Sequence, residues 1–137
     1  FVSLHCPLTD ETRDLIGSAQ LNQMKPTAYL LNLARGGVVN EDALFEALSG
    51  GDIAGAALDC FENEPVTAPH RFGALENVIL APHSIAWTDE LFRDIGKLAC
   101  GSIDDVLSGN LPHGLVNPEV LEKESFKAKW RRVLSGG

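Results

Sequence analysis

The stretch "LLNLARGGVVNEDAL", residues 30–44, contains the change from strand to helix that decides the fold. Its apolar beginning is typical of a buried strand, and the glycine pair that follows is a turn signal. Asn40 is a good helix N-cap, and Glu41 and Asp42 lie in the first turn, where acidic side chains suit the helix dipole. The stretch therefore predicts a strand, a turn and a helix, with Arg35 at the carboxyl end of the strand.

The same alternation extends over the first 83 residues. Nearly continuous apolar runs predict four strands, at 1–8, 27–34, 53–61 and 77–83. Helical signals cover residues 9–24, with Ser18 as the N-cap of their second part, and residues 40–51, where a glycine pair ends the helix. Continuous apolar strands are typical of parallel sheets buried on both faces. We therefore expect an α/β fold, a partial Rossmann-like doubly wound parallel sheet of about four strands.

A long amphipathic helix is predicted after this region, over residues 88–110. Thr88 is its N-cap, apolar side chains recur at helical spacing, and Gly109 with Asn110 ends it after about six turns. Gly96 and Gly101 inside it predict close packing against another element, because glycine otherwise weakens a helix. The proline-containing tail after it is expected to wrap or fray. We place the domain boundary between residues 1–84 and 85–137.

Composition and charge exclude several classes of protein. The 137 residues are 45% hydrophobic and 22% charged, with no apolar run of the about 18 residues that a membrane span needs. The net charge of -8 argues against nucleic-acid binding. The only basic cluster, "KAKWRR" at 127–132, is interpreted as a solvated helix face rather than a binding patch. We expect neither a nucleic-acid nor a membrane partner.

The cysteines and the first residues suggest where the protein resides. Three cysteines without CxxC spacing are typical of a reducing compartment and predict no metal site. Cys6 and Cys60 are interpreted as small apolar residues at strand ends. No basic and then apolar leader opens the chain, so we expect a cytoplasmic protein. The chain begins in mid-strand without methionine, which suggests a fragment.

The candidate functional residues lie at the carboxyl ends of the predicted strands. They are His5, Cys6, Pro7, Arg35, Asp59, Glu62, Glu64 and His83. Ligands of doubly wound sheets bind at the carboxyl ends of the strands, so these residues form the candidate site. A guanidinium orients a carboxylate, and a histidine beside a carboxylate can deliver a proton near neutral pH. This combination fits reduction of a small 2-oxo acid or oxidation of a 2-hydroxy acid.

Each of these residues also has a structural interpretation. Arg35 could pair with a neighbour in its turn, and His83 could be a loop histidine with its hydrogen bonds satisfied. The glutamates could be solvated loop acids, and Asp59 could cap a local turn. His70 and His113, in proline-containing loops, are interpreted as structural. The convergence of the set on one sheet edge favours the functional interpretation.

Four motifs in order carry a family resemblance. They are "LHCPLTDET", "LLNLARGGVVNEDAL", "GAALDCFENEP" and "NVILAPH". With their spacing they resemble the D-isomer-specific 2-hydroxyacid dehydrogenases. The resemblance implies NAD(P)-dependent oxidoreduction of a 2-oxo or 2-hydroxy acid of the glyoxylate/hydroxypyruvate or phosphoglycerate type, and a homodimer. It also implies that residues 1–84 are the C-terminal half of a dinucleotide-binding domain, followed by a long interdomain helix and tail.

The resemblance also assigns roles to residues. Arg35 would bind the substrate carboxylate and carbonyl oxygen, His83 would exchange the proton, and Glu64, rather than Glu62, would hold His83 protonated. Asp59 resembles the aspartate that contacts the nicotinamide carboxamide. The residues expected to line the cofactor are His5, Cys6, Pro7, Thr12, Leu33, Ala34, Arg35, Asp59, His83 and Ser84.

Two departures from the family pattern affect these expectations. "PHSIAWTDE" lacks the glycine-rich pair that commonly follows the histidine, so Ser84 and Trp87 are expected to reshape the mouth of the pocket. The glycine-rich GxGxxG loop is absent from these 137 residues, so we expect weak cofactor binding and no turnover by this chain alone. Exposed apolar edges predict self-association. The alternative function is a dinucleotide-sensing, corepressor-like binding protein of the same family.

Overall fold

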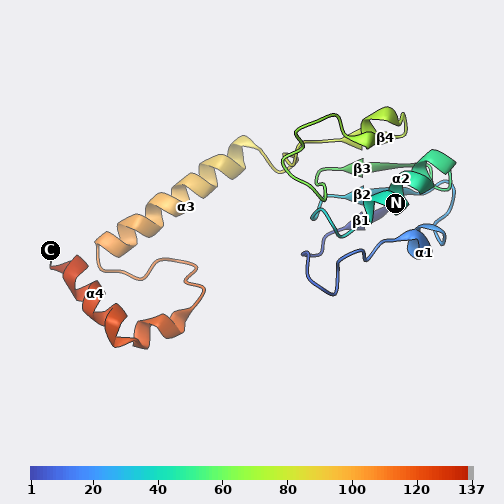
Figure 1. The fold of residues 1–137 in the computed structure, drawn as a ribbon. Helices are drawn as coiled ribbons and strands as arrows, with labels where there is room; N and C mark the ends of the chain where they lie inside the picture. The colour runs from blue at the N-terminus through green and yellow to red at the C-terminus, as the bar shows by residue number, and fades with distance from the viewer. Residues whose placement is uncertain (136–137) are drawn as a thin grey trace. The chain divides into compact units, whose positions relative to one another are not determined.

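The computed structural model describes residues 1–135, which contain two compact units, Phe1–Ala86 and the residues from Trp87 on. Figure 1 shows the elements along the chain. In order they are β1 (Val2–Leu4), α1 (Ser18–Leu21), β2 (Tyr29–Asn32), α2 (Glu41–Gly50), β3 (Gly55–Leu58), a 3-10 helix η1 (Arg71–Ala74), β4 (Val78–Leu80), α3 (Asp89–Leu107), a 3-10 helix η2 (Pro118–Glu122) and α4 (Glu124–Leu134).

The first unit is built on a parallel sheet with strand order β1-β2-β3-β4. Val2 is in register with Leu30, Leu30 with Ala56, and Ala56 with Val78. All four strands therefore end at the same edge. The predicted α/β class and the four-stranded parallel sheet are confirmed.

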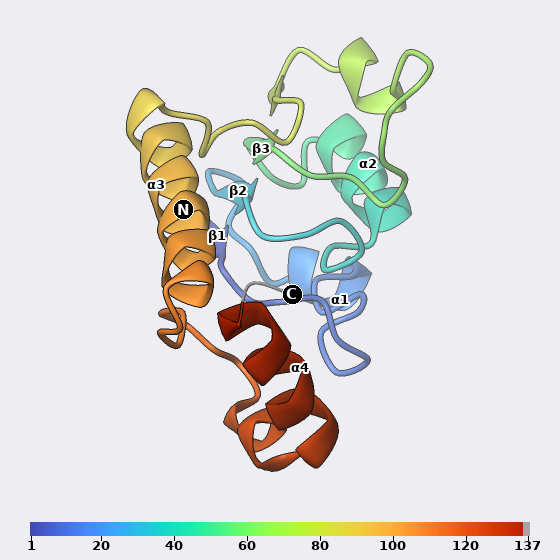
Figure 2. The same ribbon diagram turned by 90° about the vertical axis from the view of Figure 1, so that its left-hand side faces the viewer.

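The core lies between this sheet and the helices of the first unit. Leu21 of α1, Leu30 of β2 and Leu44 of α2 are all almost fully buried, together with Phe72 of η1 and Ile53 from the loop before β3. Helices α1 and α2 contact each other and lie on the same side of the strands (Figure 2). Burial of these side chains is the main term that stabilises the unit.

Helix α2 forms as its sequence predicts. The Asn40 side chain accepts a hydrogen bond from the backbone N–H of Ala43 at 2.9 Å, which is the expected N-cap. Gly51 ends the helix in the left-handed conformation, with a φ of 74°. Because the cap fixes where α2 begins, it also fixes the length of the turn that carries Arg35.

The helix predicted over residues 9–24 is wrong for its first half. Asp14 has a φ of 52°, which interrupts any helix, and Ile16 instead forms a parallel bridge with Val39. Helix α1 is only four residues long. Its N-cap is Gly17 rather than Ser18, because the Gln20 side chain accepts a hydrogen bond from the Gly17 N–H at 3.1 Å.

The second unit contains the predicted long helix. Thr88 caps α3 by accepting from the N–H of Leu91 at 3.2 Å, and the helix ends at Leu107. Close packing at Gly96 and Gly101 is not found, since a Cβ at either position would meet no described atom within 4 Å. No helix within residues 1–135 is long and apolar enough to cross a membrane.

The tail is more ordered than its sequence predicts. Residues expected to wrap or fray form η2 and α4, and the rings of Phe126 and Trp130 stack with centroids 5.5 Å apart. The basic cluster lies on α4, where Lys127 pairs with Glu122 and Glu124. The sequence pattern of the tail did not predict these contacts within η2 and α4.

Candidate functional site

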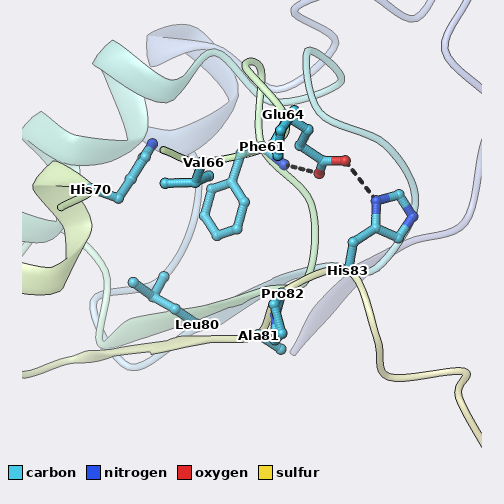
Figure 3. Close-up of a pocket in the computed structure, with 9 residues that line it drawn as sticks. Phe61, Glu64, Val66, His70, Leu80, Ala81, Pro82 and His83 are labelled. Carbon is cyan, nitrogen blue, oxygen red and sulfur yellow. Dashed lines mark hydrogen bonds and ion pairs between the residues drawn. The ribbon is translucent and has the colours of Figure 1, made fainter. Parts of the chain in front are cut away.

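Glu64 and His83, two of the predicted site residues, are in direct contact (Figure 3). The Nδ1 atom of His83 lies 2.7 Å from Oε2 of Glu64, and the backbone N–H of Phe61 donates to Oε1 at 2.8 Å. Burial raises the pKa of Glu64, but the hydrogen bonds from His83 and Phe61 and the charge of His83 outweigh it and lower the pKa below 4.5. The carboxylate is therefore held ionised against the imidazole.

The backbone around His83 is fixed by a buried carboxylate. His83 has a φ of 55°, in the left-handed region that non-glycine residues seldom occupy. Directly after it, the N–H groups of Ser84 and Ile85 donate to the two carboxylate oxygens of Asp59 at 2.8 and 3.1 Å. Asp59 is only 4% exposed, so both its oxygens need these partners. Asp59 thus caps the turn after His83, far along the chain, rather than a local turn of its own.

Arg35 lies in a tight turn at the end of β2. The side chain of Asn32 accepts from the N–H of Ala34 at 3.2 Å and donates to the carbonyl oxygen of Arg35 at 3.0 Å. The exposed Arg35 guanidinium donates to the carbonyl oxygen of Ala34 at 2.7 Å. A Cβ at Gly36 would lie 1.8 Å from the carbonyl oxygen of Phe61, so only glycine allows the backbones to approach this closely.

The predicted residues are divided between two cavities of the first unit. The larger, about 680 Å³, is lined by Phe61, Glu64, Pro65, Val66, His70, Leu80, Ala81, Pro82 and His83. The smaller, about 480 Å³, is lined by His5, Cys6, Pro7, Leu8, Leu33, Ala34 and Arg35. Arg35 therefore lies with the residues expected to contact the cofactor, and the Glu64–His83 pair lines the other cavity.

Thr12 closes the loop after β1 instead of lining the smaller cavity. Its hydroxyl donates to the carbonyl oxygen of Pro7 at 2.6 Å and accepts from the N–H of Thr9 at 2.7 Å. These bonds hold the segment that contains Cys6 and Pro7. The structure therefore gives Thr12 the role of shaping the cavity wall.

Cys60 shows that charged site residues converge around the end of β3. The pKa of its thiol is raised to about 11, chiefly by burial and then by the charges of Glu64 and Asp59, while the charge of Arg35 acts in the opposite direction. All three charges are close enough to act on one sulfur. The raised pKa keeps Cys60 a neutral, unreactive thiol, in agreement with its interpretation as a small apolar residue.

Glu62, which lies two residues before Glu64, makes different hydrogen bonds. Glu62 accepts from the N–H of Glu41 at 3.0 Å, and Glu41 accepts from the N–H of Glu62 at 2.7 Å. This reciprocal pair ties the loop after β3 to the first turn of α2. Glu62 is therefore a structural link, and of these two neighbouring glutamates Glu64 is the one that contacts a histidine.

Two residues near the site had little or no sequence signal. Asn32 carries little signal in the sequence; it is the last residue of the mostly apolar strand β2 and is 3% exposed. His70, interpreted as structural, lines the larger cavity with its ring between Phe61 and Phe72, and its Nε2 lies 3.4 Å from Glu41. The sequence signal that could have identified Asn32 is an asparagine inside an apolar strand, because a buried amide needs hydrogen-bond partners.

A known protein family matches nearly all of the first unit. Residues 1–84 match the sequence model of the family described as "D-isomer specific 2-hydroxyacid dehydrogenase, NAD binding domain". The chain belongs to this family. The resemblance inferred from the four motifs is thus confirmed for the region that holds Arg35, Glu64 and His83.

Individual 2-hydroxyacid dehydrogenases are similar over most of this chain. A glyoxylate reductase from Thermofilum pendens is 50% identical over 121 residues, which are 88% of this chain and 36% of the relative. A D-3-phosphoglycerate dehydrogenase from Methanocaldococcus jannaschii is 42% identical over 94% of this chain and 25% of its own length. The NAD-complexed D-isomer specific 2-hydroxyacid dehydrogenase from Lactobacillus delbrueckii ssp. bulgaricus superimposes with a TM-score of 0.74 at 36% identity, covering 85% of this chain and 39% of that one. The chain thus spans about a third of the length of these relatives.

Proposed function

We propose that this chain carries the proton-transfer and substrate-anchoring part of an NAD(P)-dependent D-2-hydroxyacid dehydrogenase. The observation that supports this best is the 2.7 Å contact between His83 Nδ1 and Glu64 Oε2. A histidine oriented by an ionised carboxylate is the arrangement that a general acid needs for carbonyl reduction. The similar glyoxylate reductases favour a small 2-oxo acid such as glyoxylate or hydroxypyruvate, with the phosphoglycerate type as the other candidate.

In this proposal each polar residue has a distinct task. Arg35 binds the substrate carboxylate through its planar guanidinium. His83 donates a proton to the carbonyl oxygen during reduction and removes it during oxidation, while Glu64 stabilises the charged imidazole. A bound nicotinamide cofactor supplies or accepts the hydride. The fold holds these groups in the orientation that the reaction requires before the substrate binds.

The smaller cavity suits the nicotinamide end of such a cofactor. It opens at the carboxyl ends of β1 and β2, where parallel sheets bind ligands, and small or apolar side chains form most of its wall. We propose that His5, Cys6, Pro7, Leu33 and Ala34 line the cofactor, with Arg35 at its edge. Thr12, Asp59, His83 and Ser84 would shape the surrounding backbone.

The proposal extends to the organisation of the protein. Residues 1–84 would be the second half of a dinucleotide-binding domain, and residues 85–137 a long interdomain helix with its tail. The whole enzyme would be a cytoplasmic homodimer. A glycine-rich pyrophosphate loop would come from a part of the enzyme other than these 137 residues.

The test is NADH oxidation by the whole protein with glyoxylate, hydroxypyruvate, pyruvate and 3-phosphohydroxypyruvate. We expect turnover with at least one of them, and its loss by at least about 1000-fold in Arg35→Ala and His83→Ala, because the anchor or the proton donor is then missing. Lys25→Ala and His113→Ala, which remove a charge and a histidine outside the site, are the matched controls.

Two results would contradict the proposal. Near-normal rates in both site variants would show that Arg35 and His83 are not the reacting residues. Tight NADH binding with no turnover of any 2-oxo acid would favour a dinucleotide-sensing binding protein of the same family.

A further inference from the structure

Asn32 is a polar residue at a buried position in the sheet. It is the last residue of β2, paired in register with Leu4 and Leu58, and is 3% exposed. Burying an amide is unfavourable unless both its ends are hydrogen-bonded. Both ends of the Asn32 amide are used, and both bonds go to the turn that carries Arg35.

These two bonds determine the shape of that turn. The N–H of Ala34 donates to Oδ1 of Asn32, and Nδ2 donates to the carbonyl oxygen of Arg35, so the chain is held on both sides of the Ala34–Arg35 peptide. An asparagine side chain that bridges its following backbone in this way defines a local turn. The direction in which the Arg35 side chain leaves the backbone therefore depends on Asn32.

The main chain of Asn32 extends the connection toward His83. Its carbonyl oxygen accepts from the N–H of Asp59 at 3.0 Å and from the thiol of Cys60 at 3.5 Å. Asp59 in turn accepts from the N–H groups of Ser84 and Ile85, directly after His83. A continuous set of hydrogen bonds, which passes through the buried residues Asn32 and Asp59, thus runs from the Arg35 turn to the backbone beside His83.

A second connection runs from the same turn to Glu64. Gly36 lies against the backbone of Phe61 so closely that a Cβ would come within 1.8 Å of the Phe61 carbonyl oxygen. The N–H of Phe61 donates to Oε1 of Glu64 at 2.8 Å. A displaced Arg35 turn would therefore also disturb the segment that orients the carboxylate.

We propose that Asn32 is a positioning residue that sets Arg35 in register with the Glu64–His83 pair. The inference rests on the proposed function, because it assigns Asn32 to the anchoring of a substrate carboxylate. Asn32 touches no substrate in this scheme, and it acts through the turn at Arg35. Loss of its side chain leaves Arg35 present but free to leave the geometry that a carboxylate requires.

The experiment measures steady-state kinetics of the whole protein with the 2-oxo acid it reduces best. We expect Asn32→Ala to raise the KM for the 2-oxo acid about 10- to 100-fold, with smaller changes in kcat and in the KM for NADH. Asn32→Ser, whose hydroxyl can still accept from Ala34, should give an intermediate rise and preserve folding if the alanine variant does not fold.

The matched control is Asn77→Ala. The side chain of Asn77 also bonds to the backbone, since its Nδ2 donates to the carbonyl oxygen of Leu48 at 3.3 Å. This hydrogen bond lies at the end of α2, away from Arg35. The substitution should lower stability without changing either KM. An equal rise in substrate KM in this control would mean that Asn32 acts through general stability, and would overturn the proposal.

A double-mutant cycle of Asn32 and Arg35 tests whether Asn32 acts through Arg35 or through general stability. If Asn32 acts through Arg35, then Asn32→Ala should have little further effect in an Arg35→Ala background. Equal, independent losses in both backgrounds, or an unchanged substrate KM in the Asn32 variants, would overturn the positioning role while the proposed function stands. An Arg35→Ala variant with normal kinetics would instead overturn the proposed function.

Discussion

At the scale of single residues, the chemistry depends on one ionised carboxylate. Glu64 uses one oxygen for the N–H of Phe61 and the other for His83, so neither oxygen is free to turn away. The adjacent acid Glu62 is tied to Glu41 instead. Two glutamates separated by one residue thus have different functions because different neighbours reach them.

The lowered pKa of Glu64 predicts a specific pH dependence of stability. Because its folded-state pKa lies below the ordinary 4.5, ionised Glu64 stabilises the folded protein above that pH, and the contribution is lost as the pH falls through the folded-state pKa. We expect the unfolding temperature of the wild type to exceed that of Glu64→Gln at about pH 6, and the difference to shrink toward about pH 3. Thermal unfolding across this range measures it.

The control for this prediction is Glu46→Gln on the exposed side of α2. It should change the unfolding temperature little at any pH in the range. A difference between wild type and Glu64→Gln that stays constant with pH would show that the charge of Glu64 does not stabilise the fold.

At the scale of elements, the site is made by turns that follow parallel strands. The glycine pair after Arg35 serves two separate purposes. Gly37 has a φ of 80°, which a turn of this shape requires, and Gly36 allows the turn to press against the loop after β3. The contact between two strand ends therefore depends on the absence of a single side chain.

Gly36→Ala should be strongly destabilising for this reason. The new Cβ would overlap the carbonyl oxygen and carbon of Phe61, which are backbone atoms and cannot rotate away. We expect a loss of about 3 kcal/mol or more in the free energy of unfolding, measured by urea denaturation. Gly73→Ala, where a Cβ would meet nothing within 4 Å, should stay within about 0.5 kcal/mol of the wild type. Similar stabilities for the two variants would contradict the close approach at Gly36.

At the scale of the whole molecule, each unit leaves apolar surface exposed. The strand faces opposite to α1 and α2 share Leu31, Ala57 and Ile79 in register, and Ile79 is 72% exposed. Within the second unit, α3 exposes Leu98 and Leu107 by more than 60%. Contiguous exposed apolar surface of this kind promotes association.

We therefore expect the 137-residue chain to self-associate in solution. Sedimentation velocity should show dimers or larger species, and Ile79→Ser should shift the distribution toward monomer because it removes apolar surface from the open sheet face. Glu76→Gln, a polar change just before β4, is the control and should leave the distribution unchanged. A monodisperse wild-type monomer would show that the chain covers these faces itself.

Much of the first unit could be predicted from local sequence. Apolar strands, the Asn40 cap and the linked motifs each follow from neighbouring residues, and so do the candidate residues at the strand ends. The helix expected over 9–24 failed because Ile16 pairs with Val39, a contact between segments distant in sequence. Tertiary pairing overrode local helix preference there.

The sequence by itself determined the parallel α/β sheet and the family, and through the family resemblance it predicted Arg35, Glu64 and His83 as site residues. Only the tertiary structure decided that Glu62 is tied to Glu41 and that Asn32 holds the Arg35 turn. Strand type and caps depend on residues a few positions apart, which a sequence displays. Hydrogen bonds between loops depend on how neighbouring strand ends are placed in space, and that placement exists only after the sheet has formed.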